Sequence, residues 1–133
     1  MSAKSNYLEG KLIEHVLRNT SFTSPSAVYL SLHTGDPTDA GSGAEVSGNN
    51  YSRQAITFGA HSGGTCTNSS EEEFEASGGS FGTVTHFGIW DGPTAGGSPD
   101  NLLYYGALTG GGKTIADGDK LNFAVGSISI QET

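Results

Sequence analysis

The stretch that most constrains the fold spans residues 83–90, the longest uninterrupted run in the chain that favours burial. Its threonine, valine, phenylalanine, isoleucine and tryptophan suit a pleated surface, and a run that is apolar at both alternating positions indicates a strand covered on both faces. Residues 102–108 repeat this pattern after a short connection. We therefore predict that the two segments form antiparallel neighbours at the centre of a sheet.

The composition favours a turn-rich, all-β domain. Of the 133 residues, 21 are glycine and only 34% are hydrophobic, so turns are abundant while apolar residues for a core are few. The length fits one domain, residues 1–133. Within it we expect an N-terminal arm and helix over 1–22 and a β-sandwich over 27–131.

One helix is predicted, from about Tyr7 to Arg18. Asn6 followed by Glu9 has the spacing of an N-cap and its capping-box partner. The helix presents a single apolar stripe, made of Leu8, Leu12, Ile13, Val16 and Leu17. A helix of this length is marginal alone, so it must dock on something. Its own sheet and another subunit are both open possibilities.

The remaining segments predict about seven or eight strands in a two-layer antiparallel sandwich, jelly-roll-like in type. Besides the central pair, strands are expected at 28–33, 51–58, 71–76, 113–115, 120–125 and 127–130. In the 28–33 strand, Val28, Leu30 and Leu32 should face the core and the alternate residues should face water. Val125 should also point inward, and Gly126 should form a bulge. The 34–50 segment should be a surface excursion that touches a neighbour.

Charge and cysteine content exclude several functions. The net charge of -8 argues against binding to nucleic acid or to an anionic membrane. Cys66 is the single cysteine, so an intrachain disulfide and a zinc site of several thiolates are excluded. The N-terminus lacks the apolar core of a signal peptide and no window approaches a membrane span, so we expect synthesis in the host cytoplasm without a membrane role.

No motif predicts catalysis, a cofactor or a metal site. The segment 106–114 is glycine-rich and ends in Lys113-Thr114, but Ala107 stands where a phosphate-binding loop requires glycine. The aspartates that could be imagined around a calcium ion lack EF-hand spacing; they are Asp36, Asp39, Asp117 and Asp119. The four histidines are far apart in sequence, and His86 is expected to be a hydrogen-bonded core or interface residue. We therefore expect no enzyme activity.

Much of the chain resembles a family of small structural proteins of tailed phages and prophages. The resemblance is carried by residues 6–9, by 28–32 running into 34–41, and by 45–48, 51–54, 82–89 and 102–108. Members of this family are commonly labelled tail-fibre or virion structural proteins, and β-rich phage proteins of this size also serve as capsid cement. The resemblance implies a non-enzymatic virion component and carries over no catalytic residue.

From this resemblance and the lean core we predict a capsid cement protein that self-associates, as a trimer, and binds major capsid subunits. The alternatives are a tail-fibre or tail-associated protein, and a carbohydrate-binding β-sandwich with Tyr51 beside Asn49 and Asn50. The absence of sequence repeats and heptads favours cement over a fibre. We expect partner contacts from the helix and from the 34–50 loop, at Leu8, Leu12, Ile13, Leu17, Asp36, Pro37 and Tyr51.

Overall fold

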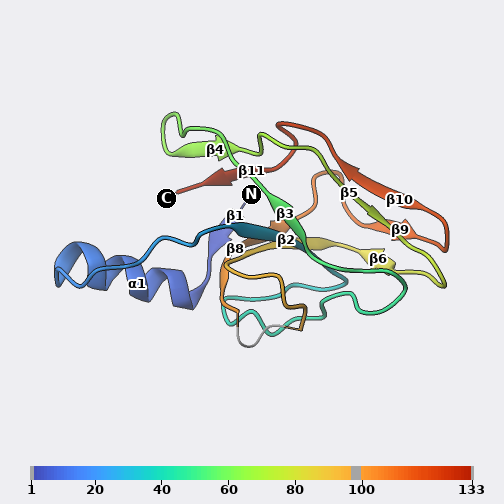
Figure 1. Ribbon diagram of the computed structural model, residues 1–133, viewed down its shortest axis with the longest axis horizontal. Coiled ribbons are helices and arrows are strands. Elements are labelled where there is room, and N and C mark those ends of the chain that lie inside the picture. Colours follow the sequence, from blue (N-terminus) through green and yellow to red (C-terminus); the bar gives the residue numbers. More distant parts are fainter. Residues whose placement is uncertain (1, 97–99, 133) are drawn as a thin grey trace.

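A computed structural model describes residues 2–96 and 100–132. Residues 1, 97–99 and 133, which belong to the predicted 1–133 domain, lie outside the described residues. The elements, in chain order, are β1 Ser2–Lys4, α1 Asn6–Leu17, β2 Val28–His33, β3 Gln54–Ile56, β4 Thr65–Thr67, β5 Glu72–Glu75, β6 Gly82–Val84, β7 His86–Trp90, β8 Leu102–Ala107, β9 Lys113–Ile115, β10 Lys120–Phe123 and β11 Ser129–Gln131. The fold is mainly β with one helix, as predicted (Figure 1).

The largest sheet has five antiparallel strands in the order β1-β8-β7-β2-β3. Strand β7 lies at its centre, between β2 and β8. The predicted pairing of the two apolar segments is confirmed, because Phe87 lies opposite Gly106 and Ile89 opposite Tyr104. The predicted 83–90 strand is broken at Thr85, however, and its first part, β6, pairs with β9 in a separate sheet.

Three two-stranded sheets complete the fold: β10 with β5 and β11 with β4 lie over the five-stranded sheet, and β6 with β9 extends from the end of β7 (Figure 1). The core lies between the layers (Figure 1). From the large sheet it takes Leu30, Leu32, Ile56, Phe87 and Ile89, and from the small sheets Phe74, Val84, Ile115, Leu121, Phe123 and Ile130. The arrangement is a sandwich whose second layer is divided into short ribbons.

The opposite face of the large sheet is also buried, which corrects the expectation of a wet face on β2. Ser31 and His33 are both 0% exposed, and Trp90 on the neighbouring strand is 2% exposed. The 34–50 loop covers this face, since the Gly43 carbonyl lies 2.7 Å from His33 Nδ1 and Gly41 lies beside the Trp90 ring. Alternation within one strand could not reveal a loop that covers it.

Other differences lie at strand ends. Sequence reasoning missed β1 and β4, and the predicted 51–58 strand is reduced to β3. Strand β10 ends at Phe123, so Val125 is 63% exposed instead of pointing inward. Gly126 has a φ of +83° within a turn that separates β10 from β11, so it is a turn residue and no bulge. The alternation of apolar and polar residues continues in the sequence through a turn that carries the chain from one sheet to another. Within that turn, alternation no longer indicates which side chains are buried.

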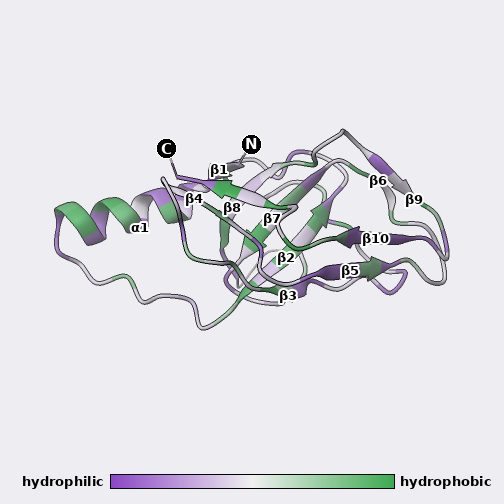
Figure 2. Ribbon diagram, turned by 90° about the horizontal axis from the view of Figure 1, so that it is seen from above, coloured by the Kyte–Doolittle hydropathy of each residue, from purple (hydrophilic) through white to green (hydrophobic). Residues whose placement is uncertain are grey.

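Helix α1 projects from one end of the molecule (Figures 1 and 2). Its N-cap is Ser5, not Asn6, because Ser5 Oγ accepts a hydrogen bond from Leu8 N–H at 3.1 Å. Asn19, with a φ of 57°, follows the C-cap and turns the chain back. Packing on its own sheet is confined to the base of the helix, where Leu8 is its one buried residue.

Candidate interaction surface

The apolar stripe of α1 is mostly exposed. Ile13 is 55% exposed, Val16 66% and Leu17 73%, whereas Leu8 is 6% exposed. These aliphatic side chains lie one to four residues apart on a helix, so they form a continuous strip on the free part of α1. Figure 2 shows this apolar character along the projecting ribbon. Of the two possibilities that the sequence leaves open, packing on the helix's own sheet accounts for the base of α1 but not for Ile13, Val16 and Leu17.

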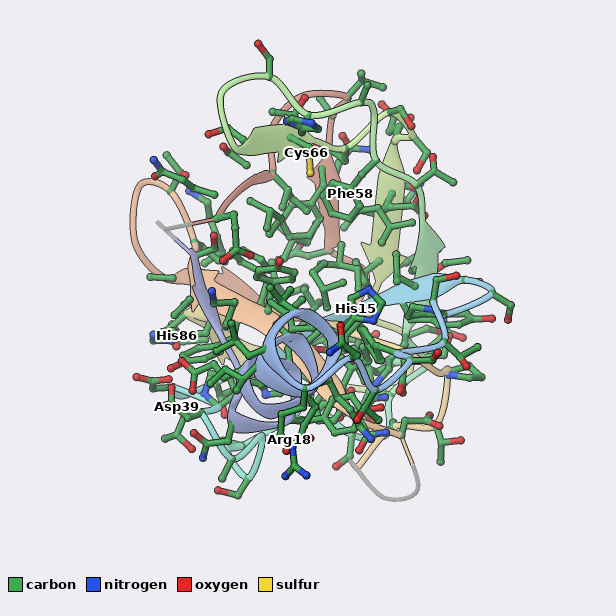
Figure 3. The ribbon with its side chains drawn as sticks, turned by 90° about the vertical axis from the view of Figure 1, so that its left-hand side faces the viewer. His15, Arg18, Asp39, Phe58, Cys66 and His86 are labelled. Carbon is green, nitrogen blue, oxygen red and sulfur yellow. The ribbon has the colours of Figure 1, made fainter. Side chains whose placement is uncertain are left out.

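The returning chain covers a different side of α1. The Phe22 ring meets the Tyr7 ring edge-on at 6.3 Å, and Phe22 N–H donates to His15 Nδ1 at 3.3 Å. Lys11 Nζ lies 5.7 Å from the centre of the Tyr7 ring. Figure 3 views the helix from its free end, with His15 and Arg18 beside it. The helix and its return segment thus form one projecting unit with an uncovered aliphatic strip.

The base of α1 is fixed firmly to the sheet. Ser5 N–H donates to Leu103 C=O at 2.9 Å, and Ser5 Oγ also donates to Leu102 C=O. Asn6 N–H donates to the backbone carbonyl of Asp39 at 2.9 Å. The Tyr105 hydroxyl donates to the Asp39 carboxylate, which raises the pKa of Tyr105 to about 12. The orientation of the helix is therefore set by the 34–50 loop as well as by β8.

A buried ion pair holds that loop to the strands. The Arg53 side chain is 0% exposed and donates from Nε and Nη2 to both oxygens of Glu45, at 2.9 and 2.8 Å. Its guanidinium lies 3.8 Å from the centre of the Trp90 ring, and Nη1 donates to Gly92 C=O at 3.1 Å. Burial by itself raises the pKa of Glu45, but hydrogen bonds from Arg53, Tyr51 and Gly96 N–H outweigh it and the pKa is lowered.

A second polar chain runs under the same loop. Trp90 Nε1–H donates to Ser31 Oγ at 2.8 Å, and Ser31 Oγ lies 2.7 Å from His33 Nε2. His33 Nδ1 lies 2.7 Å from the Gly43 carbonyl, which requires the proton on Nδ1 and leaves Nε2 to accept from the serine. Burial lowers the pKa of His33, consistent with this neutral form. A buried Ser–His pair of this kind is structural, because neither side chain is exposed to a substrate.

The predicted partner-binding residues occupy different positions. Leu12 is half-buried, Ile13 and Leu17 are exposed, and Leu8 is buried at the helix base. Asp36 is exposed, and its Oδ1 accepts from Thr38 N–H at 2.8 Å in a local turn. Pro37 is fully buried. These residues do not form one patch, so the part that a partner can reach directly centres on α1.

Tyr51 is a core residue with a polar edge. Its ring stacks on Phe74 at 6.0 Å and meets Phe81 edge-on at 5.9 Å. Its hydroxyl donates to Glu45 at 2.6 Å and accepts from Leu32 N–H at 3.1 Å. Burial, together with the charge of Glu45, raises the pKa of this hydroxyl well above its usual range. Sequence reasoning missed the Arg53–Glu45 pair beside it; an arginine beside a strand in a chain with few basic residues was the available signal.

No metal centre is assembled within residues 2–96 and 100–132. In these ranges no group of three or more histidine, cysteine, aspartate or glutamate side chains is placed to hold a metal ion. Cys66, on β4, and Phe58, labelled in Figure 3, are both partly buried against the core. Across the described ranges, no helix combines the length and the apolarity needed to cross a membrane. The feature that stands out chemically is the exposed aliphatic strip on an acidic body.

Comparison with known proteins agrees with the resemblance found in the sequence. A family model described as podophage GP4 fiber I protein gp80 matches residues 3–131, nearly the entire chain. No curated protein matches the chain. The match covers α1, the 34–50 loop and every strand from β2 to β11, so it concerns the whole fold. The chain belongs to the podophage GP4 fiber I protein gp80 family, a family of tailed-phage virion structural proteins.

Proposed function

We propose that this protein is a non-enzymatic component of a tailed-phage tail fibre. The family match over residues 3–131 carries the proposal, because the family is described by a fibre protein. A second observation supports the proposal: a helix projects from the β body with an exposed aliphatic strip that a neighbouring protein can bind. The sequence had favoured the capsid; the family description favours the tail.

Self-association belongs to this proposal. Soluble chains rarely leave several large aliphatic side chains exposed together unless they bind a partner. Ile13, Val16 and Leu17 do so on an element that its own sheet contacts only at the base. We expect a homo-oligomer, with the trimer as the predicted stoichiometry, attached to other virion proteins.

Location on the particle tests the proposal. Antibodies raised against the chain, carrying gold, should label the tail of intact virions in electron micrographs. Particles of a phage from which the gene has been deleted are the control and should remain unlabelled. Labelling confined to the capsid would contradict the fibre role.

Capsid cement remains the second candidate, and one observation favours it. The chain has no sequence repeat and no heptad pattern, so it carries no fibre shaft of its own. As a cement protein it would stabilise the head by binding major capsid subunits. Label over the whole head, together with loss of heat resistance of the particles on deletion, would support this second role.

A further inference from the structure

A groove in the β body has the properties to receive an aliphatic helix. It has a volume of about 210 Å³ and lies between the end of β8 and strand β10. Its walls include Leu108, Leu121, Phe123 and Ile128, which are core residues that reach the surface here at 4 to 8% exposure. Ala107 and Lys113 stand at its rim and are exposed. We call this site the β8–β10 groove.

The helix of the same chain cannot fill this groove. α1 projects at one end of the long axis of the molecule, while β9 and β10 lie at the other end (Figures 1 and 2). The base of α1 is fixed by Ser5, Asn6 and Leu8, so the helix does not swing across the body. The molecule therefore has an aliphatic strip at one end and an apolar groove at the other. This arrangement allows copies of the chain to bind head to tail.

Charges favour a second copy of this chain as the occupant. Glu9 lies on the same helix face as Ile13 and Val16, at spacings of four and seven residues, and is exposed. Lys113 offers the opposite charge at the rim of the groove. Residues 1–22 contain three basic and two acidic side chains, for a charge of +1, whereas residues 23–133 contain three basic and twelve acidic ones, for −9. The arm of one copy is therefore attracted to the body of the next.

We propose that α1 of one copy inserts Ile13, Val16 and Leu17 into the β8–β10 groove of the next copy, with Glu9 facing Lys113. This inference rests on the self-association included in the proposed function. Because donor and acceptor surfaces differ, each copy gives one helix and accepts one. The contacts close into a ring if the rotation between copies allows it, with three copies as the predicted number.

Association measured by light scattering and analytical ultracentrifugation tests the proposal on the full chain. Ile13→Ser combined with Leu17→Ser should raise the dissociation constant about 100-fold or more, because the contact no longer buries these two aliphatic side chains. Ala107→Trp, which fills the rim of the groove, should raise it about 10-fold or more. Ala55→Trp is the matched control, since Ala55 is an exposed alanine on β3 of the same sheet, and it should change nothing. Circular dichroism should show all variants folded.

Charge reversal adds a test that loss of folding cannot imitate. Glu9→Lys and Lys113→Glu alone should each weaken association several-fold, and the double variant should restore it, because the pair is then reversed but complementary. If the substitutions at Ile13 and Leu17 weaken association but Ala107→Trp does not, the helices pack against each other. That result would overturn the proposed contact with the groove. It would leave the fibre role standing, which labelling of virions tests separately. A wild-type chain that stays monomeric at micromolar concentration would overturn the contact outright.

Discussion

Arg53 is the centre of the buried polar interactions on the face of the large sheet that the 34–50 loop covers. It pairs with Glu45, lies 3.6 Å from Asp100 Oδ2, and places its guanidinium against Trp90. These partners come from the 34–50 loop, the segment before β8 and the central strand β7. One arginine therefore ties together the segments that cover the second face of the large sheet.

Removing Arg53 should be costly. Arg53→Ala leaves Glu45, whose side chain is 7% exposed, as a buried carboxylate without its cation, and we expect the free energy of unfolding to fall by about 3–5 kcal/mol. Urea denaturation of the purified variant measures this. Lys120→Ala is the control, because the Lys120–Glu73 pair is exposed and 3.9 Å long, and its loss should cost below about 1 kcal/mol. Equal effects of the two substitutions would contradict the importance of burial.

The buried His33 should make stability depend on pH. Its pKa is lowered from 6.5 by burial, and Glu45, Arg53 and His86 are the charged or titratable groups that act on it. Below about pH 6.5 the unfolded chain binds a proton that the folded chain does not, so the free energy of unfolding should fall as the pH drops. Glu45, with a lowered pKa, adds a separate loss below about pH 4.5. Melting temperatures between pH 8 and pH 5 measure the first effect.

His33→Asn identifies the group responsible. The variant should be less stable at pH 8, because it loses part of the Ser31–His33–Gly43 chain, but its melting temperature should vary less between pH 7 and pH 5. His61→Asn, at an exposed position outside this chain, is the matched control. An unchanged slope in His33→Asn would show that another group controls the pH dependence.

At the scale of elements, α1 depends on its cap. Ser5 is 1% exposed; its Oγ accepts from Leu8 N–H and donates to Leu102 C=O. Ser5→Ala should therefore lower the free energy of unfolding by about 1–2 kcal/mol, combining loss of the N-cap with an unpaired buried carbonyl. Ser21→Ala, in the exposed return segment, should have little effect. Chemical denaturation compares the two, and similar losses would rule against the cap.

The N-terminal arm contributes a strand to the large sheet. Ser2–Lys4 forms the edge strand β1 on β8, Lys4 pairs with Glu132, and Gln131 N–H donates to Ser2 Oγ at 3.0 Å. Deletion of residues 1–21 would remove this edge strand together with α1. Substitutions at Ile13 and Leu17 are the cleaner test of the helix, because both side chains are already exposed and their loss leaves the fold intact.

At the scale of the whole molecule, the stability of the fold should depend on assembly. If copies associate through α1, the melting temperature of the wild-type chain should rise with protein concentration, since assembly stabilises the folded state by mass action. Differential scanning calorimetry over a 50-fold range of concentration measures this. The Ile13→Ser, Leu17→Ser variant should melt at a temperature that does not depend on concentration. A constant melting temperature for the wild type would contradict assembly.

Local sequence patterns determined the elements whose signal lies within a few residues. The periodicity of residues 7–18 predicted α1, and the apolar runs at 86–90 and 102–107 predicted the central pair of strands. Glycine and alternation together predicted an antiparallel, mainly β chain. These features follow from short-range geometry, in which a helix repeats every 3.6 residues and a strand every two.

The tertiary structure decided everything that required distant segments to meet. In the folded chain the 34–50 loop covers Ser31 and His33, and Arg53 pairs with Glu45. Val125 lies exposed in a turn between two sheets. The tertiary structure also left Ile13 and Leu17 uncovered, because α1 leaves the sheet after Leu8. An apolar stripe in a sequence states that a surface favours burial, but whether the chain or a partner buries it depends on where the fold directs the helix.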